Sequence, residues 1–245
     1  MYTVLGIIAA PLGKLLDLLY GFVGHYGITI IIFTVIVKVC LYPLYIKQIK
    51  STARMQEMQP KIQEIQNKYA NDREMMNIKM AELQKEEKFS PMGGCLPMLI
   101  QMPIIMGLFA LLRNPMRYME NDNMIFAFHE SFLWIKDLSQ PDLWILPIIA
   151  GVATFFSFTM NRALTETPAG ANQMAGMTKM MQYVFPLMIL WMARSFPSGL
   201  ALYWAVSQVI QIFFNIHMSS VRNKMKRESE ERKMRAKLEK KLAQQ

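Results

Sequence analysis

The chain has 245 residues, of which 53% are hydrophobic, and it carries 27 Lys and Arg against 18 Asp and Glu. Its apolar residues are gathered into long runs between charged segments, which excludes an ordinary soluble domain, where they would recur periodically. The net charge of +9 predicts an anionic partner such as phospholipid head groups or ribosomal RNA. The two cysteines lack CxxC spacing and the three histidines are scattered, so we expect no disulfide, metal site or cofactor.

Residues 1–24 are predicted to form a helix that lies in the membrane interface. Leucines and other apolar residues recur there at helical spacing, with Lys14 and Asp17 between them: Leu12, Leu15, Leu16, Leu19, Phe22 and Val23. This pattern is typical of an amphipathic helix lying in the plane of the membrane. A secretory signal would carry positive charge before its apolar core, but Met1–Pro11 has no charged side chain. We therefore expect this helix to remain uncleaved.

Five apolar runs approach the ~20 residues that a membrane-spanning helix needs. They are residues 28–46, 95–112, 143–160, 180–193 and 199–216. The expected fold is therefore an all-α membrane protein with five transmembrane helices, a cytoplasmic helical hairpin and an N-terminal interfacial amphipathic helix. Residues 25–220 would form its core, with the hairpin at 48–92 and a basic tail at 221–245.

The distribution of Lys and Arg predicts the orientation in the membrane. These residues are dense in 47–88 and in 222–241, whereas the alternate loops hold only Arg113, Arg117, Lys136 and Arg194. Basic segments stay in the cytoplasm, so we expect the N-terminus outside and the C-terminus inside. The hairpin has apolar residues at helical intervals and a break at Asn71–Asp72, whereas the tail has few apolar residues. We expect the tail to fray, or to become helical only on contact with a partner.

Lys38 lies within the first apolar run, where a lysine costs roughly 2.5–3.5 kcal/mol on insertion scales. Such a residue normally faces a bundle interior or a hydrated cavity. Thr34, Lys38 and Tyr42 follow at four-residue intervals and share one helix face. The alternative is that Lys38 extends along the helix toward the cytoplasmic head groups near Lys47.

Polar residues form stripes on other spans as well. They are Gln101 in the second span, Thr154, Ser157 and Asn161 in the third, and Trp204, Ser207, Gln208, Gln211 and Asn215 in the fifth. Each stripe alone is more typical of hydrogen bonding between membrane helices. Together with Lys38 they would line one hydrated groove open to the cytoplasm.

Methionine is abundant, with 23 residues. Those on the second and fourth spans include Met98, Met102, Met106, Met188 and Met192. Flexible, polarizable methionine suits a surface that accepts varied apolar segments, which would make these two helices a sliding surface for substrates. Filling of gaps in a loosely packed bundle is the alternative.

Five segments in order resemble the YidC/Oxa/Alb family of membrane protein insertases. They are Gly27–Leu44 (GITIIIFTVIVKVCLYPL), Met55–Tyr69 (MQEMQPKIQEIQNKY), Pro91–Ile104 (PMGGCLPMLIQMPI), Leu133–Phe155 (LWIKDLSQPDLWILPIIAGVATF) and Phe196–Trp204 (FPSGLALYW). The resemblance covers roughly residues 20–220. It implies a five-helix insertase with an inward-open hydrophilic groove. In the family an intramembrane arginine marks that groove, and Lys38 stands at its position; lysine keeps the charge but lacks the bidentate fork.

We also expect a non-enzymatic function, and because the sequence shows no nucleotide-binding motif we expect hydrophobic partitioning to drive insertion. Nascent membrane proteins would enter the groove, contact Lys38 and leave into lipid. The tail, through Arg222, Lys224, Lys226 and Arg227, would contact the ribosome or anionic lipids, and the general secretory translocon is a further candidate partner. The expected location is a bacterial plasma membrane. Two other functions stay open on the sequence alone, a small transporter or channel with Lys38 as its ion site, and an assembly chaperone.

Overall fold

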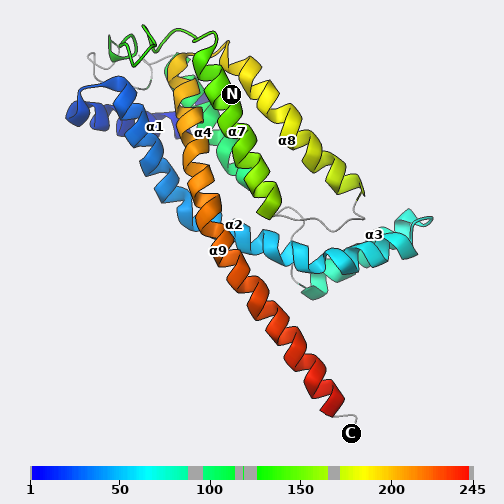
Figure 1. The fold of residues 1–245 in the computed structure, drawn as a ribbon. Helices are drawn as coiled ribbons and strands as arrows, with labels where there is room; N and C mark the ends of the chain where they lie inside the picture. The colour runs from blue at the N-terminus through cyan, green and yellow to red at the C-terminus, as the bar shows by residue number, and fades with distance from the viewer. Residues whose placement is uncertain (1, 88–95, 114–117, 119–125, 165–171, 243–245) are drawn as a thin grey trace.

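The computed structural model describes residues 2–87, 96–113, 118, 126–164 and 172–242. Within these ranges the chain is helical and has no strand, which confirms the all-α prediction for the described residues (Figure 1). The helices are α1 (Tyr2–Val23), α2 (Tyr26–Lys68), α3 (Arg73–Glu87), α4 (Leu96–Arg113), α7 (Ile145–Leu164), α8 (Asn172–Ala193) and α9 (Ser198–Leu242). The end of the expected hairpin and the beginning of the expected second span, at 88–95, lie outside the described residues.

Helices α2, α8 and α9 are longer than the apolar runs that predicted them. Helix α2 contains the run 28–46 but continues to Lys68, with Pro43 and Pro60 inside it. Helix α8 begins at Asn172, before the apolar run that predicted it. Hydropathy did not predict its first turns because they contain polar residues. A helix and the apolar run within it are therefore different segments in this chain.

Helix α9 bundles with the other helices through its first half and then extends away from them (Figure 1). The expectation that the tail frays differs from the structure, in which one helix runs from Ser198 to Leu242. No glycine or proline interrupts Leu200–Leu242, and Glu231 stands four residues before Arg235, a helix-stabilising spacing. A helix that continues from a packed segment also needs no new nucleation.

Helix α1 packs against α4 and α2. It ends at a sharp turn in which Gly24 adopts a positive φ of 69° and its N–H donates to the carbonyl of Tyr20 at 2.8 Å. This left-handed residue closes the helix end and reverses the chain into α2. Figure 1 shows α1 running crosswise to α7 and α9 at one end of the bundle.

The core of the bundle is apolar and is centred on α9, which packs against α7 and α2. Its fully buried side chains include Phe33 on α2, Leu111 on α4 and Leu146 at the start of α7. Helices α1, α2, α4, α7, α8 and α9 therefore each contribute apolar side chains to the core. The opposite faces remain exposed and apolar too, including Val39 on α2, Phe156 on α7 and Phe213 on α9, as expected for helices surrounded by lipid.

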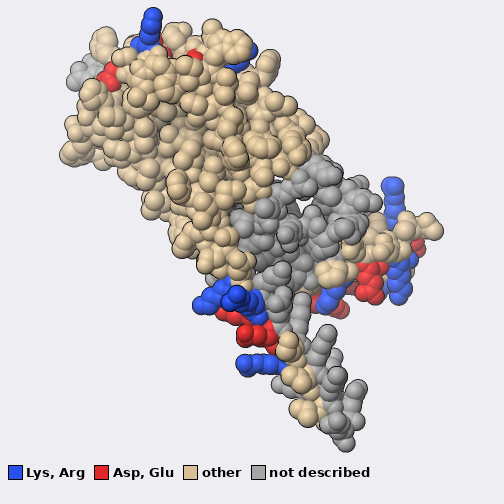
Figure 2. Space-filling model, viewed as in Figure 1, with Lys and Arg blue, Asp and Glu red and all other residues tan. Residues whose placement is uncertain are grey.

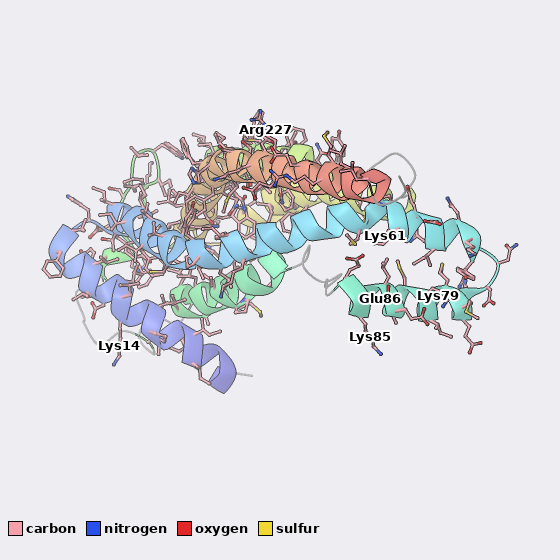
Figure 3. All side chains as sticks on the ribbon, turned by 90° about the horizontal axis from the view of Figure 1, so that it is seen from below. Lys14, Lys61, Lys79, Lys85, Glu86 and Arg227 are labelled. Atoms are coloured by element: carbon pink, nitrogen blue, oxygen red, sulfur yellow. The ribbon has the colours of Figure 1, made fainter. Side chains whose placement is uncertain are left out.

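The second half of α2 and α3 form an antiparallel hairpin beside the bundle. Ile62 and Leu83 are its buried pair, and Met58, Ile65 and Met80 pack around them. Asp72 caps α3 by accepting a hydrogen bond from the N–H of Met75 at 3.0 Å. Figure 3 shows the two helices side by side, with Lys61 on α2 and Lys79, Lys85 and Glu86 on α3.

On the face of the molecule that Figure 2 shows, the body of the bundle carries almost no charged side chains. Figure 2 shows Lys, Arg, Asp and Glu gathered at the lower end, over the hairpin and the α9 extension, with a few more at the upper end. We call the lower end the hairpin face and the upper end, which holds residues 126–144 and the turn Arg194–Pro197, the loop face. The uncharged region between the two faces has the surface of a protein embedded in hydrocarbon.

Residues of the segment 126–144 form hydrogen bonds with the ends of four helices, α1, α2, α7 and α9, at the loop face. The Glu130 carboxylate accepts hydrogen bonds from the Tyr20 hydroxyl at 2.5 Å and from the N–H of Tyr26, the first residue of α2, at 2.6 Å. The N–H of Gly199 donates to the carbonyl of Leu138 at 2.9 Å. The N-cap residue of α2, His25, makes no side-chain cap hydrogen bond. Glu130, from a loop distant in the chain, caps the helix instead.

Two aspartates of this segment are held ionised by their hydrogen bonds. Burial raises the pKa of Asp142, but bonds from the Trp134 indole and from the N–H groups of Trp144 and Leu146 outweigh it and lower the pKa below its usual value. Burial likewise raises the pKa of Asp137, and bonds from Ser139 and His129 bring it below its usual value. Asp142 thereby caps the start of α7 as an anion.

Candidate functional site

Lys38 is buried between α2 and α9, with only 3% of its surface exposed. Its ammonium nitrogen donates a hydrogen bond to the Tyr45 hydroxyl at 3.1 Å and makes a longer one to Gln211 Oε1 at 3.4 Å. Among the described residues no carboxylate lies within 4.0 Å of this nitrogen. The Lys38 amine is therefore held by neutral groups alone among the described residues, so a positive charge on it would have no counter-charge there.

The hydrogen bonds of Lys38 continue into a chain that crosses the bundle. Gln211 Nε2 donates to Asn215 Oδ1 at 3.2 Å, and Asn215 Nδ2 donates to the backbone carbonyl of Ser157 on α7 at 3.2 Å. This polar chain connects α2, α9 and α7. Side chains of this kind hold membrane helices together, so it has a structural role as well as a position beside the cation.

A second polar cluster lies two turns earlier on α9, about 10 Å along the helix axis. The Trp204 indole donates to the Thr154 hydroxyl at 2.9 Å, and Gln101 on α4 donates to the Tyr203 hydroxyl at 3.2 Å. Ser207 and Gln208, both buried, stand between the two clusters on α9. The polar residues therefore form a column along α9 that begins at Trp204 and ends at Asn215.

Two residues expected beside Lys38 point elsewhere. The Thr34 hydroxyl is buried and donates to the carbonyl of Ile30 in its own helix at 2.6 Å. The Tyr42 ring packs against Phe214, with 5.1 Å between centroids. Tyr45 bonds Lys38 instead. It stands seven residues after Lys38, a spacing that also keeps it on the same face, and this was the signal that sequence reasoning missed.

The methionines lie largely on helix surfaces. Met102 and Met106 on α4 and Met188 on α8 are exposed, and Met192 is half-buried. The side chain of Met98 lies outside the described residues. Helices α4 and α8 each pack against α9, so both border the helix that carries the polar column.

The basic tail forms the free end of α9, where Lys224 and Arg227 are exposed. Arg227 is labelled in Figure 3. The side chains of Arg222 and Lys226 lie outside the described residues. In the part of the chain that the structure describes, no three His, Cys, Asp or Glu side chains are placed to hold a metal ion.

Comparisons with known proteins all lead to one family. The model of the family described as 60Kd inner membrane protein matches residues 18–228. The "Membrane protein insertase YidC" of Fusobacterium nucleatum is 41% identical over 202 residues, which cover 82% of this chain and 89% of that protein. The protein of the same name from Geobacter sulfurreducens is 41% identical over 207 residues, which cover 84% of this chain and 36% of that protein.

A solved structure gives the same result for the fold. It is described as "Active YidC insertase crystal structure with the first transmembrane domain resolved" and superposes with a TM-score of 0.58 at 31% identity. The match covers 84% of this chain and 44% of that chain. The chain thus spans most of the Fusobacterium protein but less than half of the Geobacter protein and of the solved one.

Proposed function

Because this chain belongs to the 60Kd inner membrane protein (YidC/Oxa/Alb) family of multi-pass membrane proteins, we propose that it inserts nascent membrane proteins into the lipid bilayer. The relatives named above are insertases rather than enzymes in the ordinary sense. The observation that carries the proposal within this chain is the buried amine of Lys38, which has no carboxylate partner among the described residues. A cation inside a membrane helix costs roughly 2.5–3.5 kcal/mol on insertion scales, which favours a role with a transient anionic partner.

The proposed membrane placement has α2, α4, α7, α8 and α9 crossing the bilayer and α1 lying along its surface. Among the described residues, three helical segments have the length and apolar character to cross, Gly6–Val23, Tyr26–Lys47 and Ser198–Ser220. The crosswise course of α1 supports an interfacial position despite its length (Figure 1). The apolar parts of α4, α7 and α8 are shorter than ~20 residues, which favours a locally thinned bilayer around them.

The hairpin face would be cytoplasmic and the loop face external. Lys and Arg of the α2–α3 hairpin and of the α9 extension gather at the hairpin face (Figure 2), and the positive-inside rule puts such segments in the cytoplasm. Helices α2 and α9 would then carry Lys38 and Gln211 in the cytoplasmic halves of their spans. Substrates would meet the cation from the cytoplasmic side.

In the proposed mechanism, the short polar tail of a nascent membrane protein enters beside the polar column of α9. Lys38 pairs with an acidic side chain of that tail, and Gln208, Gln211 and Ser207 offer hydrogen-bond partners to its backbone. These groups lower the cost of moving polar peptide groups into the membrane, where each unsatisfied group costs several kcal/mol. The tail would then be released on the external side.

The apolar segment of the substrate would leave into lipid along the methionine surfaces of α4 and α8. Exposed Met102, Met106 and Met188 can adapt to substrates of different shapes. Partition of the apolar segment into lipid would supply the driving force without nucleotide hydrolysis. The exposed basic end of α9 would keep the ribosome or anionic lipid close to the entry side, and the general secretory translocon is a candidate partner at the lipid-facing surfaces.

The test is autonomous insertion by the purified protein. A single-span substrate with a short external tail is synthesised beside liposomes that contain only this protein, and protection of its tail from added protease is measured. Empty liposomes and liposomes with an unrelated multi-pass protein are the controls. Protection only with this protein supports insertion. Folded protein that gives no protection but lets ions leak would contradict it and favour a pore.

A further inference from the structure

Arg194 sits in an unusual position for a basic residue of this chain. It begins the turn between α8 and α9 at the loop face, where Lys and Arg are scarce. Its guanidinium carbon lies 4.4 Å from the centroid of the Trp144 ring, just before α7. A guanidinium stacked on an indole is held flat, so its N–H edges are presented in a fixed plane.

The donors of Arg194 have no partner among the described residues. In the described part of the chain its guanidinium makes no hydrogen bond and no ion pair. The acid beside Trp144 in sequence, Asp142, is engaged by other donors, since one of its oxygens binds the Trp134 indole and the N–H of Leu146 and the other binds the N–H of Trp144. A planar fork with free donors is the geometry that binds phosphate bidentately.

The surface next to Arg194 is apolar and exposed. Trp191 and Leu187 lie one and two turns before it on α8, with 71% and 67% of their surface exposed. Ile148, one turn after Trp144 on α7, is exposed as well. The two helices pack closely at Gly151, where an added Cβ would come within 3.2 Å of Leu190 Cβ, so this apolar surface is continuous across both helices.

We propose that Arg194, held on Trp144, binds the phosphodiester group of a phospholipid whose acyl chains lie on the α7–α8 surface formed by Ile148, Leu187 and Trp191. A free phosphate ion would use the guanidinium but would leave the apolar surface uncovered. A phospholipid matches both parts, with its charge at the level of an interfacial tryptophan and its chains along the helices. The bound lipid would connect the start of α7 to the α8–α9 turn at the loop face.

The test compares two lipids without net charge, so that general electrostatic attraction to the protein is equal for both. Trp191→Phe protein, which keeps the Trp134–Asp142 hydrogen bond, is reconstituted with phosphatidylcholine or with galactosyl diacylglycerol, each brominated at the acyl chains, and quenching of Trp144 fluorescence gives their relative binding. A variant with Trp144→Phe in addition supplies the background of Trp134 and of the buried Trp204. The proposal predicts that the phosphate-bearing lipid binds at Trp144 about fivefold better, as expected when one charged group gains a hydrogen-bonded phosphate partner.

Variants locate this preference at Arg194. We expect Arg194→Gln to bring the ratio close to one, Arg194→Lys to keep part of it, and Lys136→Gln, on the same face, to leave it unchanged. Equal quenching by the two lipids in the parent protein, or a preference that survives Arg194→Gln, would overturn the proposal. Loss of the preference on addition of inorganic phosphate at constant ionic strength would assign the site to a free anion instead.

Discussion

Lys38 on α2 and Gln211 on α9 stand 173 residues apart in the chain, and their side chains meet at 3.4 Å inside the bundle. The amide oxygen of Gln211 faces the cation and its amide nitrogen faces Asn215, so this residue connects Lys38 to α7. Tyr45 completes the set of neutral partners. The position that a carboxylate would occupy beside Lys38 is therefore held by an amide.

Replacing Gln211 by Glu supplies that carboxylate from within the protein. The internal ion pair would compete with the acidic tail of a substrate, so we expect insertion of acid-tailed substrates to fall about fivefold, on the order of 1 kcal/mol, with unchanged or higher thermal stability. Protease protection and thermal unfolding in detergent measure the two effects. Gln211→Leu is the control, because it removes the amide but leaves the cation free. A Glu variant as active as the parent would contradict a substrate-binding role for the cation.

Gly27 is required by the close approach of the loop segment to α2. A Cβ at this position would lie 2.3 Å from the Phe132 ring and 2.9 Å from its Cβ, so the loop backbone has to move. We expect Gly27→Ala to destabilise the protein by about 1–3 kcal/mol, as overpacking does. Gly21→Ala is the matched control, since nothing lies within 4 Å of its added Cβ, and it should leave stability unchanged or raise it. Equal melting temperatures for both variants would refute this packing.

Glu130 holds the junction of α1 and α2 through two charge-assisted hydrogen bonds. Glu130→Ala leaves the N–H of Tyr26 without its acceptor, so we expect a loss of about 1.5–3 kcal/mol and faster hydrogen exchange at Tyr26. Glu130→Gln keeps an acceptor oxygen and should lose less. Glu82→Ala, at an exposed ion pair with Lys79, is the control and should show no measurable loss. An Ala variant as stable as the Glu82 control would remove Glu130 from this role.

The lowered pKa of Asp142 makes the loop face sensitive to acid. The carboxyl binds its proton less readily in the folded protein than in the unfolded chain, where its pKa is about 4. Its stabilising contribution is therefore complete above about pH 4 and is lost as the pH falls from there through the folded pKa. Thermal unfolding followed from about pH 7 to pH 3 should show this loss in the parent and a smaller one in Asp142→Asn. Identical pH profiles would contradict the cap.

The sequence alone predicts that Lys38 faces away from lipid, because the cost of a cation in an apolar run depends only on the residues around it. Its partners follow from packing between helices, which a single sequence does not display. Tyr42 and Tyr45 both share a face with Lys38, and the position of α9 decides between them, since Tyr42 packs against Phe214 and His217. Spacing alone therefore does not distinguish Tyr42 from Tyr45 as the partner of Lys38.

Sequence patterns also do not predict the contacts between residues distant in the chain or how far each helix continues. Glu130 reaches Tyr26 across 104 residues, and nothing near either residue indicates the pair. Hydropathy does not predict the helical tail, because few of its residues are apolar. Helix propensity and the absence of Gly and Pro do favour a helix there. The hairpin was predictable because its turn, at Asn71 and Asp72, and its apolar spacing are both local.

The central claim is that the charge of Lys38 pairs with acidic groups of the substrate. The most direct measurement is protease protection in proteoliposomes for a substrate with an acidic tail and for the same substrate with its Asp and Glu replaced by Asn and Gln, each with the parent protein and with Lys38→Ala. The account predicts that Lys38→Ala reduces insertion of the acidic tail at least about fivefold more than that of the neutral tail, the equivalent of roughly 1 kcal/mol. An equal reduction for both tails, with folded protein in every sample, would contradict it.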